Sequence, residues 1–98
     1  MASLAKAPPA PQNVEIGGAV QPSTTLRWDK PDSDLIKGYK IYWRPTSKPL
    51  WESQRYVGDV SQFTLENIVI DNYLFGVSAV GKDGHESVVS YPSGLIRD

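Results

Sequence analysis

Apolar and polar residues alternate with a period of two along several short stretches of this chain. In residues 24–28, Leu26 and Trp28 share one face, and Thr25 and Arg27 share the other. This alternation is typical of a β-strand with one buried face, because successive side chains of a strand point to opposite sides. Together with neighbouring stretches rich in strand-forming residues, seven strands are predicted: residues 12–16, 24–28, 39–44, 54–57, 63–66, 73–79 and 87–91.

Glycine and proline interrupt the chain often enough to leave little room for helices. The eight glycines and eight prolines cut most of it into pieces shorter than the roughly ten residues of an ordinary helix. Turn signals recur roughly every 8–12 residues, a spacing typical of a β-sandwich. We therefore predict an all-β fold of seven antiparallel strands in two sheets, with a small barrel as the alternative.

The length of 98 residues leaves room for one domain and one hydrophobic core. Residues 1–11 are rich in alanine and proline, which favour an extended linker over a helix. We expect this linker to precede a sandwich that spans residues 12–98. The isolated domain is expected to fold alone and to be monomeric.

Charge and composition exclude several classes of function. Ten Lys+Arg against eleven Asp+Glu give a net charge of −1 with no basic stripe, so nucleic acid is not an expected partner. No apolar run approaches the ~18–20 residues that span a bilayer, and membrane insertion is not expected. The absence of cysteine excludes disulfides, thiolate metal sites and cysteine nucleophiles.

The only histidine, His85, limits the catalytic chemistry that the chain can carry. It follows Lys82, Asp83 and Gly84 and precedes Glu86 in a stretch that reads as a tight turn, because Asp-Gly favours hairpins. Asp83, His85 and Glu86 could together hold a metal or act as acid and base, but a solvated loop tip is the favoured interpretation. We expect no catalytic residue, no metal and no cofactor.

Aromatic and arginine side chains gather around the third predicted strand. If Tyr39 and its alternate neighbours face inward, Tyr42 must face outward, and Trp51 lies just before the next strand. Arg44 and Arg55 are expected to stack on these two rings. This group is either a contact patch for a protein or a sugar ring, or a cover over the outer face of a sheet.

Five motifs follow one another along the chain: Pro11–Val14, Leu26–Trp28, Ile36–Arg44, Phe63–Leu65 and Tyr73–Val80. In this order they resemble a fibronectin type III domain from Pro9 to Pro92. The resemblance implies an immunoglobulin-like sandwich and a tyrosine, here Tyr73, whose hydroxyl bonds to backbone a few residues upstream. The residues expected to form the core are Trp28, Tyr39, Ile41, Leu65, Tyr73, Phe75 and Val77.

The stretches 71–80 and 83–87 are similar, more narrowly, to the accessory type III modules of bacterial secreted zinc aminopeptidases. The resemblance implies a non-catalytic accessory, spacer or protein-contact module of a larger exported protein, extracellular or periplasmic, that touches a neighbouring domain or another protein. Alternatives are a carbohydrate-binding module and an adhesion or receptor module in a tandem array. Some members of the family carry Arg-Gly-Asp in the loop at Lys82, Asp83 and His85; this chain does not, and the loop remains a candidate contact.

Overall fold

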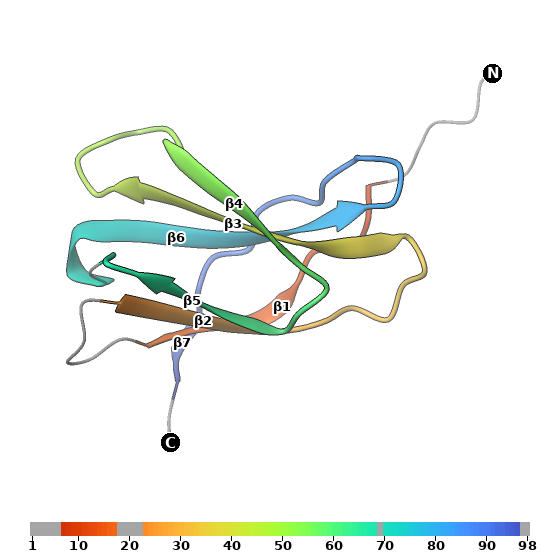
Figure 1. The fold of residues 1–98 in the computed structure, drawn as a ribbon, viewed down its shortest axis with the longest axis horizontal. Coiled ribbons are helices and arrows are strands. Elements are labelled where there is room, and N and C mark those ends of the chain that lie inside the picture. Colours follow the sequence, from red (N-terminus) through yellow and green to blue (C-terminus); the bar gives the residue numbers. More distant parts are fainter. Residues whose placement is uncertain (1–6, 18–22, 69, 97–98) are drawn as a thin grey trace.

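Two β-sheets face each other in the computed structural model, which describes residues 7–17, 23–68 and 70–96 (Figure 1). The first sheet has four strands in the order β5-β2-β1-β7. Their bounds are β1 Gln12–Gly17, β2 Ser23–Asp29, β5 Gln62–Glu66 and β7 Gly94–Leu95. The predicted sandwich is therefore confirmed, and the barrel alternative is not what the chain forms.

The second sheet has three strands in the order β4-β3-β6. These are β3 Ile36–Pro45, β4 Ser53–Gly58 and β6 Tyr73–Gly81, and a single 3-10 turn, η1 Ile70–Asn72, leads into β6. Both β4 and β6 pair with β3 in antiparallel register. The central strand β3 thus presents one face to the core and the other to solvent.

The core lies between the sheets and is built from the inward positions of the alternating stretches. Leu26 and Ile41 are fully buried, and the ring of Trp28 lies 5.6 Å from that of Tyr39. Six of the seven expected core residues are buried: Trp28, Tyr39, Ile41, Leu65, Phe75 and Val77.

Tyr73 is the exception among the expected core residues. It is half-buried and packs against the core from its edge, with its ring 6.4 Å from that of Phe75. Among the described residues, no hydrogen bond joins the Tyr73 hydroxyl to backbone upstream. The corner implied by the family resemblance is therefore not seen in the part of the chain that the structure describes.

The last predicted strand, residues 87–91, is wrong as a strand. The β-pairing of this part of the chain with β6 is limited to two isolated bridges, Val80–Glu86 and Val77–Ser90, and the strand β7 forms later, parallel to β1. At Ser87 the side-chain oxygen accepts a hydrogen bond from the amide of Ala79, in place of a ladder carbonyl. Pro92 then lacks the amide that a ladder would need, and the chain crosses to the other sheet.

The end of the expected linker packs against the sandwich. Pro8 and Pro11 are buried, and the Ser90 hydroxyl donates a hydrogen bond to the carbonyl of Pro11 at 2.7 Å. Residues 1–6 of the predicted linker lie outside the described residues. Within the described ranges, no helix is long and apolar enough to cross a bilayer.

Candidate functional site

The outer face of β3 carries the aromatic group that the sequence indicates. Tyr39 and Ile41 point into the core, so Lys40, Tyr42 and Arg44 take the outward positions between and beyond them. Lys40 Nζ lies 5.9 Å from the centre of the Tyr42 ring. The outward face of this strand therefore alternates cations with an aromatic ring.

Trp51 lies beside this strand and completes a row of three rings. Its ring is 6.0 Å from that of Tyr42 and 5.8 Å from that of Tyr91, with which it is stacked. The Arg44 guanidinium lies 5.5 Å from the centre of the Trp51 ring and donates a hydrogen bond to the carbonyl of Lys48. The predicted meeting of Tyr42, Arg44 and Trp51 is confirmed.

Gly76 allows Trp51 to lie close against the sheet. It faces outward from β6, directly across from Tyr42. A Cβ atom at this position would lie 3.3 Å from Trp51 Cζ2 and would overlap Val89 Cγ1. A glycine inside a strand often marks such a close approach, so the Leu74-Phe75-Gly76-Val77 stretch already carried a signal for this site.

Glu86 is hydrogen-bonded to Tyr42, the ring at one end of the row. Its carboxylate accepts hydrogen bonds from Tyr42 Oη at 2.5 Å, from Lys40 Nζ at 3.0 Å and from Ser78 Oγ at 3.0 Å. These bonds join the last segment of the chain to β3 and β6. Glu86 thus fixes two of the side chains that form the outer face.

The Glu86 contacts shift two titrations in opposite directions. Burial raises the pKa of the Glu86 carboxyl, but the hydrogen bonds from Tyr42, Lys40 and Ser78 outweigh it, and the pKa lies below its ordinary value. Burial and, to a smaller extent, the hydrogen bond to Glu86 raise the pKa of Tyr42 to about 12. Tyr42 therefore stays protonated, and Glu86 stays charged, at neutral pH.

The sequence did not place Glu86 and Tyr91 in this site. Glu86 was grouped with Asp83 and His85, whereas the structure turns it away from them toward the sheet. Tyr91 was expected only as part of a strand. Both positions depend on how the segment after β6 runs back alongside that edge strand, and local alternation does not encode that path.

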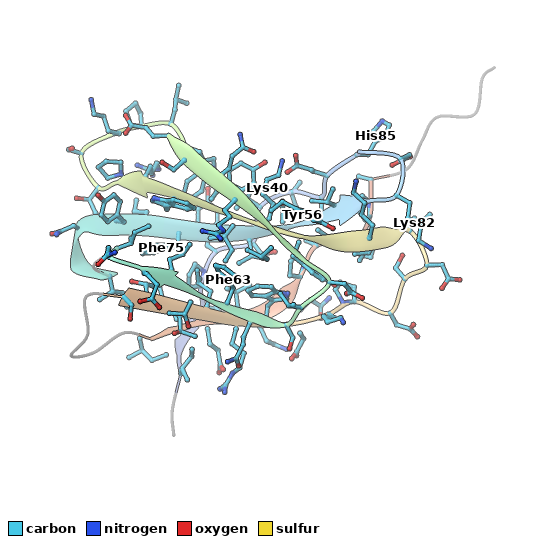
Figure 2. All side chains as sticks on the ribbon, in the orientation of Figure 1. Lys40, Tyr56, Phe63, Phe75, Lys82 and His85 are labelled. Atoms are coloured by element: carbon cyan, nitrogen blue, oxygen red, sulfur yellow. The ribbon has the colours of Figure 1, made fainter. Side chains whose placement is uncertain are left out.

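Lys82, Asp83 and His85 form a separate exposed turn at the other end of β6, away from the β3–β4 loop (Figure 2). His85 Nδ1 lies 3.2 Å from Asp83 Oδ2, and the His85 amide donates to Asp83 Oδ1. This hydrogen bond from the His85 backbone N–H is the largest cause of the lowered pKa of Asp83. Gly84 takes a φ of 92°, as a tight turn requires. No group of three or more His, Cys, Asp or Glu side chains that could hold a metal occurs within the described ranges.

Arg55 is not part of the aromatic row, and the expectation that it stacks on Tyr42 or Trp51 is wrong. In β4 it pairs with Ile41, an inward position of β3, and its guanidinium lies over the ring of Phe63 at 5.1 Å. The outward positions of β4 belong to its neighbours. One of these, Tyr56, pairs with Lys40 (Figure 2).

The sequence of this chain is similar to a family of known domains and to segments of longer proteins. The family model described as "Fibronectin type III domain" matches residues 9–93. A protein of Pyricularia oryzae named "Probable zinc metalloprotease" is 40% identical over 94 residues, covering 92% of this chain. A protein of Pyrenophora tritici-repentis with the same name is 38% identical over 103 residues, covering all of this chain.

The chain spans about a fifth of the length of these curated relatives, 18% of the first and 24% of the second. The relatives are fungal, and the bacterial source expected for the parent enzyme stays a prediction. Among solved structures, a titin module from human cardiac muscle has a TM-score of 0.65 at 22% identity, covering 88% of this chain and 86% of that one. At that identity the likeness shows the fold alone.

Proposed function

We propose that this chain, which belongs to the fibronectin type III family, is a non-catalytic accessory module of a larger, exported zinc metallopeptidase. The type III sandwich is a non-catalytic fold, so any peptidase activity belongs to another part of such a protein. The module's task in this proposal is contact with a neighbouring domain of the same polypeptide or with another protein.

The observation that carries the proposal is the similarity to a short segment of proteins named as zinc metalloproteases. At 40% identity over 94 residues the match covers nearly the whole module, yet only 18% of the relative's length. The remaining length is ample for a separate catalytic domain, since domains typically run 50–250 residues. Export is supported by the resemblance of residues 71–80 and 83–87 to modules of secreted aminopeptidases.

The outer face of the second sheet supports protein contact as the module's task. Tyr, Trp and Arg are the residue types enriched among the energetically dominant positions of protein interfaces. Tyr42, Arg44, Trp51 and Tyr91 bring these types together on one face. Tyr91 is 61% exposed and so is accessible to a partner.

The coding sequence on either side of this chain tests whether the module is part of a zinc metallopeptidase. We expect one reading frame to join the module to a domain with the ligands of a zinc peptidase. Deleting the module from that parent should leave a measurable zinc-dependent peptidase, and the isolated chain should show no turnover, with or without His85→Ala. A reading frame with no peptidase domain, or zinc-dependent turnover by the isolated chain that His85→Ala abolishes, contradicts the proposal.

The row of rings also favours carbohydrate binding as a second candidate function. Sugars stack on exposed aromatic faces, and the Trp51–Tyr91 pair is stacked with its planes 29° apart. Trp51 is already contacted by Arg44 and Tyr42, which leaves less of its surface for a sugar. Affinity electrophoresis through gels containing polysaccharides distinguishes the two functions: retardation that Trp51→Ala abolishes supports sugar binding, and no retardation on any polysaccharide removes it.

A further inference from the structure

An apolar groove opens where the chain crosses from one sheet to the other. Its volume is about 350 Å³. The side chains that line it are Ile16, Tyr73, Leu74, Phe75, Tyr91 and Pro92. Leu74 and Tyr91 are substantially exposed, so the groove has an accessible rim above a buried floor at Phe75.

The groove is continuous with the aromatic row. Tyr91 lines the groove and also stacks on Trp51. Leu74 lines it too, and lies directly across from Arg44 in the register of β3 and β6. We call the surface formed by Tyr42, Arg44, Trp51, Leu74 and Tyr91 the Arg44–Tyr91 surface.

The charge around this surface is unevenly distributed. Three cations lie on or beside it, Lys40, Arg44 and Lys48, against two acidic residues, Glu52 and Glu86. Lys40 is paired with Glu86, and Lys48 lies 3.9 Å from Glu52. Within the described part of the chain, Arg44 makes no ion pair; one of its five N–H donors is used on the Lys48 carbonyl.

We propose that the Arg44–Tyr91 surface binds an acidic segment of a protein, with an apolar side chain of that segment in the groove and its carboxylates facing Arg44. The inference rests on the proposed function only in assuming that the module contacts protein. The groove can hold an apolar or aromatic side chain, and the planar guanidinium of Arg44 can bind a carboxylate. The surface therefore fits an acidic peptide that also carries aromatic residues. A purely anionic polymer would leave the groove empty.

The surface is held in place before any partner arrives. Glu86 fixes the Tyr42 hydroxyl, the Lys48 carbonyl holds Arg44, and Trp51 lies against Gly76. Side chains that are already ordered lose little freedom on binding, which leaves more of the contact energy as affinity. The same contacts limit the shape of the partner, because they hold Tyr42, Arg44 and Trp51 in place.

Binding of synthetic polymers to the 98-residue chain, measured by calorimetry, tests this inference. The probes are a random copolymer of glutamate and tyrosine, polyglutamate of the same length, and heparin. We expect the copolymer to bind at least tenfold more tightly than either other probe, and more weakly as salt is raised. Arg44→Gln and Tyr91→Ala should each weaken copolymer binding at least fivefold. Arg27→Gln, which removes a cation of the opposite sheet paired with Glu15, should leave it unchanged.

Each other outcome overturns the inference. Equal affinity for polyglutamate shows that the groove contributes nothing, and equal affinity for heparin with the same dependence on Arg44 identifies a site for anionic polymers in general. Absence of copolymer binding removes the inference. It does not affect the proposal that the module is part of a zinc metallopeptidase, because the adjoining coding sequence tests that proposal. Thermal unfolding of each variant checks the fold, and the exposed Tyr91 gives a second variant should Arg44→Gln unfold.

Discussion

At the scale of single residues, Gly76 is the position on which the aromatic row depends. Replacing it with alanine would place a methyl group against Trp51 and Val89. Overpacking of this kind typically costs about 1–3 kcal/mol, so Gly76→Ala should lower the free energy of unfolding by that amount in urea denaturation. Gly84→Asn is the matched control at an exposed turn, because asparagine tolerates positive φ and nothing lies within 4 Å of a Cβ there. Equal stability of Gly76→Ala and the parent chain would show that the rings can move away freely.

Glu86 should make stability depend on pH in the acid range. Its pKa is lowered in the folded chain, so the folded state gains stability above the carboxyl's ordinary value of 4.5 and loses that gain as pH falls through the lower folded value. Glu86→Gln should therefore cost about 1 kcal/mol at neutral pH, since hydrogen bonds to charged groups contribute about 1.5–3 kcal/mol and this carboxylate is partly exposed. The difference between parent and variant should shrink as pH is lowered below 4.5 in denaturation curves. A difference independent of pH would show that the carboxylate's charge is not involved.

At the scale of elements, local alternation predicted the strands that bury one face, and it failed where pairing depends on distant parts of the chain. Leu26 and Trp28 alternate with polar neighbours, and β2 forms there with those two side chains inside. Residues 87–91 have a strand-like composition, but Val88 is 78% exposed and the side chain of Ser87 replaces a ladder acceptor. The two-residue β7 pairs in parallel with β1 and has no local pattern that could indicate it.

The candidate site divides in the same way. Tyr42 and Trp51 could be predicted because the period of two along β3 fixes which side chains face out. Arg55 was misplaced because the register of β4 against β3 sets it opposite Ile41, and one residue of slip changes the face. Glu86 and Tyr91 were missed because they arrive from the segment after β6, whose path is set by Ser87 and Pro92.

Ser87 should hold that segment in place. Its hydroxyl oxygen accepts from the Ala79 amide at 2.8 Å and its hydroxyl donates to the Val88 carbonyl. Ser87→Ala leaves the Ala79 amide, inside β6, without this acceptor, which costs about 1–3 kcal/mol for a buried donor. Ser93→Ala, at an exposed position, should stay within about 0.5 kcal/mol of the parent chain. Equal melting temperatures for the two variants would contradict this role of Ser87.

At the scale of the whole molecule, one core without disulfides supports the entire fold. Trp28 is among its largest fully buried side chains, and its indole nitrogen has no hydrogen-bond partner among the described residues. Trp28→Ala should cost about 3–5 kcal/mol through the cavity it leaves, a large part of the ~5–15 kcal/mol that stabilises a small domain. Trp28→Phe should cost clearly less, because it keeps an aromatic ring and removes an unpaired donor. A loss below 1 kcal/mol for Trp28→Ala in chemical denaturation would show that the core does not depend on this ring.

Hydrogen exchange of the module inside its parent protein, compared with the isolated chain, tests most directly whether the outer face of the second sheet is where this domain meets its partner. Bound partner should protect the backbone amides that border the Arg44–Tyr91 surface, in residues 46–52 and 87–91, and Tyr91→Ala should remove that protection. The exposed turn at residues 82–85 and the strands of the opposite sheet should exchange equally in both forms. Protection confined to residues 82–85 or to the opposite sheet, or no protection anywhere, would contradict the assignment of this face as the contact surface.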